Sequence, residues 1–348
     1  MIKINWSFRK IEKELLKTNK YYAYISKITN LQKNIADSLV FVKWKNDIKN
    51  DSVVFIKPNF TFPSYREGIT TSPLVLKHLL EIITNRAKRV IVGESDGGNR
   101  SFSAQDAFKG HNMYEICKDV GVELVNLSEL PSMNVEKKIN GTLVRVEVPK
   151  ILVEEVDCLI SVPVLKVHVM TKVTLSMKNL WGCYPDAMRC LHHKNLSRKL
   201  TLLTKVLNPK LTIIDGIYGL DGHGPMFGTF KKLDLLLASN NIVVADSLGS
   251  NVMGISPRTV SHIKIAEKEG LGTTILDNVI LNQDWQQFSN KFQINKTFTD
   301  YLSVFLFNSE LLAKFVMDSP MTPFIYSLAK YLRNSDEERV ANELKRCY

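Results

Sequence analysis

The chain has 348 residues, and its 45% hydrophobic and 23% charged content excludes a disordered or fibrous protein and predicts a folded globular one. The formal net charge of +11 produces a field that attracts anions such as phosphorylated metabolites, nucleic acid or an acidic membrane surface. Charge alone does not choose among these three partners.

Residues 1–50 form a basic, amphipathic lead-in, in which we expect a strand over 21–28 and a helix over 35–44. A regular pattern then begins with the apolar run VVFI, which predicts a buried strand. The segment 73–85 carries leucines and isoleucines at helical spacing. Ser72 is its candidate N-cap, and the proline that follows fits the first helical turn.

Short apolar runs alternate with helical segments through the rest of the first half of the chain. Strands are predicted over 89–92 and 122–125, separated by a short helix over 114–120. Such alternation favours parallel βαβ units. The segment 142–148 alternates apolar and polar residues, so we expect it to form an edge strand of a hairpin.

In the second half we expect strands over 158–162, 211–214 and 233–238, followed by helices in IVVADSLGSNVMG and TVSHIKIAEKEGLG. The predicted fold class is therefore α/β with a mainly parallel sheet of βαβ units. We expect two lobes, 51–150 and 151–290, around a cleft, and a helical appendage at the C-terminal end.

Residues 291–348 differ in character, because aromatic and amphipathic segments replace the alternation of strands and helices. One interpretation is a pair of helices that caps the core. The other is a peripheral contact with a membrane, in which aromatic rings enter the interface beside cationic side chains. The residues of this contact would be Phe305, Phe307, Phe315, Phe324 and Tyr331, with Lys314, Lys330 and Arg333.

Polar loops follow four of the predicted strands, and the carboxyl ends of parallel strands face one crevice. Lys57 and Asn59, on either side of a proline, are candidates for binding an anion. Thr70 and Thr71 stand near a predicted helix start, where hydroxyl and N–H groups bind phosphate or carboxylate. Glu94, in GESDGG, is a candidate base, sugar ligand or cation ligand.

The predicted loop DGIYGLDGHGPMFG contains five glycines, a density that favours close approach of the backbone to a ligand. Gly224 and Gly228 are its candidate ligand-binding positions, and Asp215 at its start is a candidate proton acceptor. The GxGxxG pattern of dinucleotide-binding proteins is absent from the sequence.

The segment PVLKVHVMTKVTLSMKNLWGCYPDAMRCLHH follows a buried strand and carries many reactive side chains. Lys166 and Asn179 are candidate ligand-binding residues. Lys178 lies among apolar residues, and burial lowers the pKa of a lysine toward values useful for proton transfer or nucleophilic attack. His168 is a candidate acid or base, and His193 a candidate metal ligand, since imidazole serves both roles near neutrality.

The five cysteines include no CxxC pair, and Cys183 and Cys190 lack ordinary zinc-site spacing. An apolar N-terminal signal and the ~20 apolar residues of a membrane span are both missing. We therefore expect a cytoplasmic protein. A dense Lys/Arg block with interleaved glycine or aromatic residues is missing too, so nucleic acid is not an expected partner.

Taken in order, the pieces IKPNF, GITTSP, VIVGES, PVLKVH…TLSMKNLWG…H, IIDGI…GHGP and VVADS resemble the family catalogued as domain of unknown function 362. They lie within residues 53–272, roughly two thirds of the chain. Members of that family are often fused to iron-sulfur ferredoxin modules, and this chain lacks the ferredoxin cysteines.

The same segment resembles, more distantly, the lactate racemase family of nickel-pincer enzymes, in which two histidines flank a lysine at similar spacing. Here the three residues are His168, Lys178 and His193. The resemblance implies that Lys178 carries a nickel-pincer nucleotide, that His193 is a nickel ligand and that His168 acts on the substrate. It also implies hydride transfer at a sugar or hydroxy-acid carbon.

We therefore expect an enzyme that acts on an anionic small molecule, a phosphorylated or carboxylated metabolite or sugar, by proton or hydride transfer. Its candidate cofactor is a nickel-pincer nucleotide or another metal. The alternative is a non-catalytic ligand-binding or assembly factor, for example in surface-glycan synthesis at the inner membrane face, whose C-terminal region docks on the membrane.

Overall fold

The computed structural model describes residues 21–330, except the side chains of Tyr326 and of 328–330. The first part of the basic lead-in, Tyr331 and Arg333 therefore lie outside the described residues. The expectations attached to them stay predictions.

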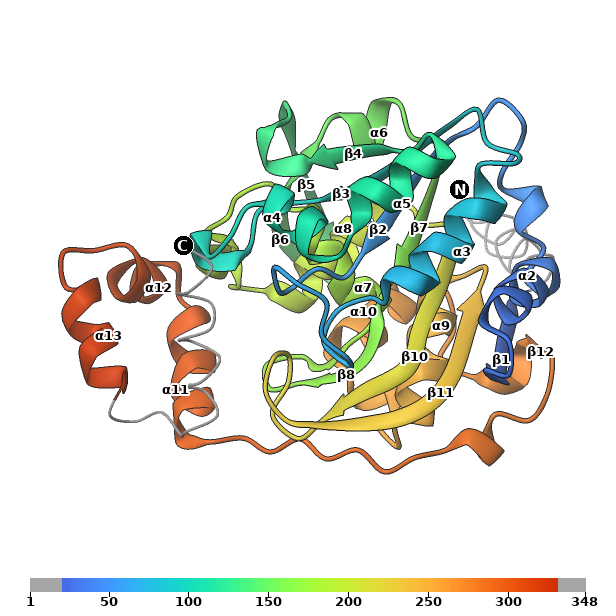
Figure 1. Cartoon of the computed structure of the whole chain (residues 1–348). Coiled ribbons are helices and arrows are strands. Elements are labelled where there is room, and N and C mark those ends of the chain that lie inside the picture. The colour runs from blue at the N-terminus through green and yellow to red at the C-terminus, as the bar shows by residue number, and fades with distance from the viewer. Residues whose placement is uncertain (1–20, 331–348) are drawn as a thin grey trace, which may run out of the picture.

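A ten-stranded sheet forms the centre of the described chain, in the order β12-β1-β11-β10-β7-β2-β3-β4, with β8 beside β10 and β9 beside β8 (Figure 1). Its strands are β1 (Tyr22–Lys27), β2 (Val53–Pro58), β3 (Arg89–Glu94), β4 (Glu123–Asn126), β7 (Cys158–Val162), β8 (Val164–His168), β9 (Lys172–Thr174), β10 (Leu211–Asp221), β11 (Thr229–Ser239) and β12 (Ile280–Leu281). A separate antiparallel hairpin consists of β5 (Ser132–Ile139) and β6 (Thr142–Pro149).

Helices lie between and beside the strands. The α-helices are α2 (Leu31–Phe41), α3 (Pro73–Ile83), α4 (Ala104–Gly110), α5 (Met113–Val120), α6 (Ile151–Glu154), α7 (Ser176–Asn179), α8 (Leu196–Leu207), α9 (Ile242–Val252), α10 (Ser261–Lys268), α11 (Phe298–Phe307), α12 (Glu310–Met317) and α13 (Thr322–Lys330). Three short 3-10 helices matter for the site: η2 (Gly98–Arg100), η4 (Leu180–Cys183) and η5 (Arg189–His192).

The five adjoining strands β10, β7, β2, β3 and β4 run parallel, which confirms the predicted α/β class with a mainly parallel sheet. In this part of the sheet, strands are added on both sides of β2 as the chain proceeds. From β2 it proceeds to β3 and β4, and later adds β7 and β10 on the other side of β2. The order therefore reverses between β2 and β7, where open α/β sheets place their ligands.

Helices cover both faces of the sheet, because successive residues of a buried strand point to opposite sides. On β2, Val54 packs into the core under α2, α3 and α5, whereas Phe55 packs into the core with α8, α9 and α10. Helix α3 starts with Pro73 at its first position, as predicted, and buries its apolar stripe against this sheet. β2 and β7, from the two predicted lobes, pair directly, so the division into lobes stays a prediction.

The structure corrects several expected boundaries. The first helix covers Leu31–Phe41 rather than 35–44, because Asn30 caps it by accepting the N–H of Lys33. The glycine-rich segment from Asp215 to Asp221 is not a loop but the second half of β10, held by β11 on one edge and β8 on the other, with a bulge after Gly216. The remaining turn carries the glycines at 222–228.

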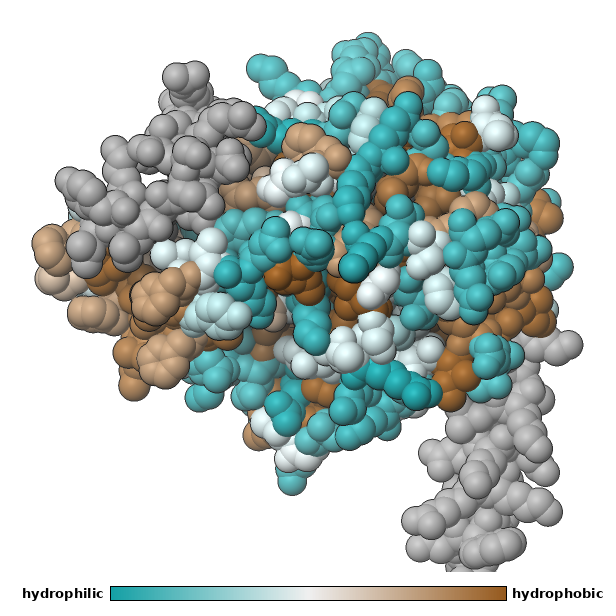
Figure 2. All heavy atoms as spheres, turned by 90° about the horizontal axis from the view of Figure 1, so that it is seen from below, coloured by the Kyte–Doolittle hydropathy of each residue, from teal (hydrophilic) through white to brown (hydrophobic). Residues whose placement is uncertain are grey.

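Helices α11, α12 and α13 project from the side of the sheet domain (Figure 1), which confirms helices in the C-terminal region. Large apolar side chains are exposed along all three, and Figure 2 shows the resulting brown surface at the left. These side chains are Phe298, Tyr301, Leu302, Phe305, Leu311, Leu312, Phe315, Met321 and Phe324, called the aromatic face below. No helix of the described chain is long and apolar enough to cross a membrane.

Candidate functional site

A cavity of about 120 Å³ opens at the carboxyl ends of β2 and β3, beside the point where the strand order reverses. We call it the switch-point cavity. Elements far apart in the sequence line it: the strand ends of β2 and β3, strand β8, and the helices α7, η4 and η5. The predicted site residues that line it are Lys57, Asn59, Glu94, Lys166, His168, Lys178 and Asn179.

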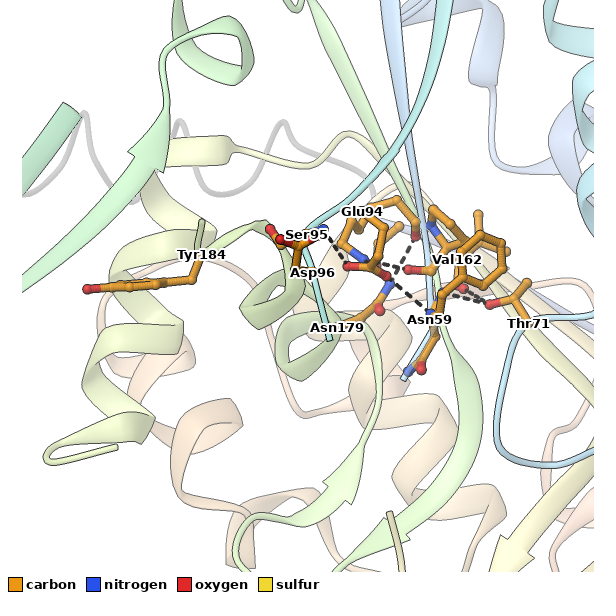
Figure 3. A network of polar contacts seen from close by, with 12 residues as sticks. Asn59, Thr71, Glu94, Ser95, Asp96, Val162, Asn179 and Tyr184 are labelled. Carbon is orange, nitrogen blue, oxygen red and sulfur yellow. Dashed lines mark hydrogen bonds and ion pairs between the residues drawn. The ribbon is translucent and has the colours of Figure 1, made fainter. Parts of the chain in front are cut away.

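Lys57 and Glu94 form a buried ion pair at the end of the two neighbouring strands, with Nζ 2.5 Å from Oε2. The same Nζ donates to the carbonyl of Pro58 at 2.7 Å. The carboxylate accepts the N–H groups of Phe60 and Ser95 at 3.1 and 3.2 Å (Figure 3). Both charges are therefore paired and hydrogen-bonded, as burial of an ion pair requires.

Amide and hydroxyl groups join the end of β2 to the neighbouring elements (Figure 3). Thr71 Oγ1 donates to the carbonyl of Val162 at 2.6 Å and accepts the N–H of Asn59 at 2.8 Å. Asn179 Nδ2 donates to the carbonyl of Lys57 at 3.0 Å. Lys166 Nζ donates to the Asn59 amide oxygen at 3.2 Å. Thr71 itself does not line the cavity; it positions Asn59, which does.

Lys178 makes no hydrogen bond or ion pair with any residue that the structure describes. Burial, and second the nearby Arg189, lower its pKa to about 8. The neighbouring His168 accepts the N–H of Met170 at Nδ1, 3.1 Å away, so a neutral ring carries its proton on Nε2. Burial first, and then Lys178, hold the pKa of His168 well below its ordinary value. His168 is therefore a neutral imidazole beside a readily deprotonated lysine.

Arg189, from η5, adds a further buried cation. Its guanidinium donates to the carbonyls of Asp96, Tyr184 and Asp186 at 2.5, 3.3 and 3.3 Å, and burial lowers its pKa. Carbonyls satisfy its N–H groups without neutralising its charge. The lining therefore contains four lysine and arginine side chains, Lys57, Lys166, Lys178 and Arg189, and one carboxylate, Glu94. Burial first, and then Lys178, hold the pKa of Lys166 well below its ordinary value, so Lys178 and Arg189 carry the positive charge that no carboxylate pairs with.

Three further lining side chains have buried polar atoms without a hydrogen-bond partner among the described residues: Ser95 Oγ, Thr174 Oγ1 and Trp181 Nε1. The indole N–H can only donate, and each hydroxyl can donate. An unpaired buried donor is unfavourable, so these groups indicate a ligand with several acceptor atoms.

Sequence reasoning missed Arg189, Trp181, Ser95 and Thr174 as site residues, although all but Ser95 lie within the reactive segment after β7. A usable signal was the tryptophan, because a buried indole usually has a partner for its N–H.

Other predicted residues lie away from the cavity. Thr70 Oγ1 accepts the N–H of Arg66 at 2.9 Å. Asp215 accepts the N–H groups of Ser72 and Ile217 at 2.7 and 3.1 Å, and burial raises its pKa to about 6. The Ser72 side chain does not cap α3; its N–H is held by this aspartate instead.

Gly224 and Gly228 permit close packing within the protein. A Cβ at Gly224 would lie 1.9 Å from the carbonyl oxygen of Val167, and one at Gly228 would lie 2.0 Å from that of Asp221. Pro225, next to Gly224, does line the switch-point cavity. The glycines therefore shape the turn, and a direct role in ligand binding stays a prediction.

His193 lines a second cavity, whereas Lys178 lines the switch-point cavity. The two residues that the racemase resemblance pairs thus line different cavities, which does not fit a pincer nucleotide held between them. Within residues 21–330, no group of three or more His, Cys, Asp or Glu side chains could hold a metal ion.

Three comparisons show which known proteins this chain resembles. A family model described as "Domain of unknown function (DUF362)" matches residues 54–251. A thylakoid-associated protein of Synechocystis sp. is 31% identical over 127 residues, 34% of this chain and 40% of that protein, so the chain spans less than half of its length. A crystal structure of a Thermotoga maritima protein aligns with a TM-score of 0.34 and 12% identity, over 53% of this chain and 50% of that one.

Proposed function

The chain belongs to the DUF362 family, and on this premise we propose that its switch-point cavity binds the phosphate or carboxylate group of a small molecule, on which Lys178 and His168 transfer a proton. The observation that carries this proposal is the coincidence of excess positive charge with unpaired donors in one cavity. An oxyanion satisfies both, because it supplies negative charge and several acceptor oxygens.

Lys178 and Arg189 would hold the oxyanion, with the Trp181 indole and the hydroxyls of Ser95 and Thr174 as further donors. Each of these groups now lacks either a counter-charge or a partner. Binding would restore to the donors the hydrogen bonds that they lost on leaving water.

Proton transfer would use Lys178, whose pKa burial lowers to about 8, so that it both gives and takes a proton close to neutral pH. Neutral His168 carries its proton on Nε2 and would donate it to the oxygen on which negative charge develops as Lys178 takes a proton. The proton would leave a carbon or hydroxyl next to the bound anionic group. Glu94, paired with Lys57, would orient the bound molecule, and Asp215 would hold the start of α3.

Binding is tested by calorimetric titration of the protein with inorganic phosphate. We expect Lys178→Met to weaken phosphate binding at least about tenfold, because the variant loses a charge-assisted hydrogen bond to the anion. Lys118→Met, an exposed lysine on α5, is the matched control and should bind like wild type. Equal affinities of all three proteins would overturn the oxyanion site.

Proton transfer is tested in D₂O with a panel of sugar phosphates and 2-hydroxy acids, by measuring deuterium incorporation into carbon with mass spectrometry. We expect the wild type to label at least one compound, and Lys178→Met and His168→Gln to label none. If phosphate binds but no compound is labelled, the protein is the ligand-binding factor of the alternative interpretation.

A second candidate function, docking on an anionic membrane, is favoured by the aromatic face of α11–α13. Phe305 is 67% and Leu311 83% exposed, although soluble surfaces rarely expose a large contiguous apolar patch. Aromatic rings suit the membrane interface, and the net charge of +11 suits anionic lipid. One relative is a thylakoid-associated protein, and this supports docking on a membrane. We propose that docking places this protein in the cytoplasm at the inner membrane face.

Flotation with phosphatidylglycerol vesicles tests this second candidate. We expect the double variant Phe305→Ser with Leu311→Ser to lose most vesicle binding without loss of thermal stability, since both side chains are exposed. Phe230→Ser removes an exposed ring on β11, outside the aromatic face, and is the control. Undiminished flotation of the double variant would rule out docking through this face.

A further inference from the structure

The second cavity, of about 370 Å³, lies where α11 packs against the core. The turn between β8 and β9, the start of α8 and helix α10 form its other walls. It shares no lining residue with the switch-point cavity. It is therefore a separate space, to which the proposed function assigns no ligand.

One side of this cavity is polar and carries a single full charge. Arg198 is the charged residue of the lining, and no carboxylate is among the lining residues. Its Nε is buried without a hydrogen-bond partner in the described chain, as is Nδ1 of His193. Burial first, and then Lys178, lower the pKa of His193 to about 3, so its ring is neutral and Nδ1 can carry the proton.

The other side is apolar. Val304 and Phe307 face the cavity from α11, and Ile265 faces it from α10. Met170 and Leu196 complete this surface. A ligand that is polar throughout would leave these side chains against polar atoms, whereas a hydrocarbon would leave the guanidinium unpaired.

We infer that the second cavity binds an amphiphilic monoanion, a carboxylate that bears an alkyl or aryl group. Arg198 pairs with the carboxylate and His193 donates a second hydrogen bond from Nδ1. The hydrocarbon lies between α10 and α11. The site is independent of the oxyanion chemistry proposed for the switch-point cavity, and either can fail without the other.

Calorimetric titration of the full chain with sodium octanoate tests this site, with acetate and octan-1-ol as the two partial probes. We expect one octanoate per chain and weaker binding of both partial probes. Arg198→Met should weaken octanoate at least about tenfold, as loss of a charge-assisted pair does. Arg258→Met, an exposed arginine outside the cavity, should leave the affinity unchanged.

Val304→Trp provides a second variant, which fills the cavity with an indole and keeps Arg198. We expect it to fold and to lose octanoate binding, and it decides the question alone if Arg198→Met does not fold. The inference is overturned if octanoate does not bind the wild type, or if it binds Val304→Trp and Arg198→Met as tightly as wild type. The latter result would place octanoate on the aromatic face.

Discussion

At the scale of single residues, the switch-point cavity holds its lysines in three different ways. Lys57 is paired with Glu94, Lys166 donates to neutral oxygens, and Lys178 has neither kind of partner in the described chain. The position of Lys57 after a buried strand was enough to predict it at the site. The sequence marks Trp181 as a residue that needs a partner for its N–H, but it does not show that this donor is left unpaired among the described residues of the folded chain.

Because of Lys178, the free energy of unfolding of the unliganded protein should change with pH in the alkaline range. Its pKa is about 8 in the folded state and near 10.5 in the unfolded chain, so between these values the folded state binds fewer protons. Stability from this group therefore rises as pH increases from 8 to 10.5. Urea denaturation at pH 8 and 10 should show a smaller rise for Lys178→Met than for Lys118→Met. An identical rise would contradict the lowered pKa.

Trp181→Phe separates the role of the indole N–H from that of the ring. The phenyl ring retains packing against Tyr184, whose ring centre lies 5.0 Å from the indole. Since the N–H has no partner among the residues that the structure describes, we expect thermal stability to stay within about 1 kcal/mol of wild type, while phosphate affinity falls about threefold to tenfold. Calorimetry measures the affinity and thermal denaturation the stability. Unchanged affinity would show that the indole donor does not reach the anion.

At the scale of elements, α7 shows how a very short helix can hold a reactive lysine. It has four residues, and its first two N–H groups, from Ser176 and Met177, donate to the carboxylate of Asp246 on α9 at 2.7 and 2.9 Å. A four-residue helix has too little periodicity to be identified from the sequence. A contact between residues seventy positions apart decides it.

We expect Asp246→Asn to destabilise the protein by about 1 to 3 kcal/mol, because one acceptor oxygen is replaced by a donor that faces backbone N–H groups. Phosphate affinity should fall too, since Lys178 follows directly in α7. Ser250→Ala, which removes an unpaired buried hydroxyl from the same helix α9, is the matched control and should be close to neutral. Urea denaturation and calorimetry measure the two effects. Loss of stability without loss of phosphate binding would limit Asp246 to a structural role.

The segment from Asp215 to Asp221 is a second element whose type could not be predicted from its own sequence. Two of its glycines made it resemble a loop, yet a central position between β11 and β8 keeps it extended. Glycine is tolerated there because Gly216 lies against β11, where a Cβ would be 2.8 Å from the carbonyl oxygen of Leu235. Local composition could not predict this packing, since both partners come from elsewhere in the chain.

At the scale of the whole molecule, the alternation of strands and helices was sufficient to predict the parallel sheet and the crevice at its carboxyl edge. It was not sufficient to predict the antiparallel pairing of β1 and β11, because an apolar strand has the same pattern in either direction. The position of the C-terminal helices was equally undetermined, since among their described side chains the large apolar ones are mostly exposed and only Ala313 is buried.

Buried histidines should make the whole protein sensitive to acid. Burial lowers the pKa of His111 to about 4 and that of His262 to about 3, so between these values and 6.5 the unfolded chain binds more protons and stability falls as pH decreases. Asp215 and Asp246, with pKa values raised by burial to about 6 and 7, act in the opposite direction.

The variant His262→Leu tests this balance, because it removes a ring whose two nitrogens are buried without partners in the described chain. We expect the variant to gain more stability over wild type at pH 5 than at pH 7.5. Urea denaturation at both values gives the comparison, with His78→Leu, a partly exposed histidine on α3, as the control. An equal gain at both pH values would show that His262 does not resist protonation.

The ring of His193 lies between Trp181, which lines the switch-point cavity, and Phe307, which lines the second cavity. His193 lies 5.8 Å from the indole of Trp181 on one side and 5.9 Å from the ring of Phe307 on the other, measured between ring centres. Trp181 is therefore a natural fluorophore that lines the switch-point cavity and lies one ring away from the second cavity. With the other three tryptophans replaced by phenylalanine, its emission would register occupancy of the switch-point cavity directly, and occupancy of the second cavity through a displacement of the His193 ring.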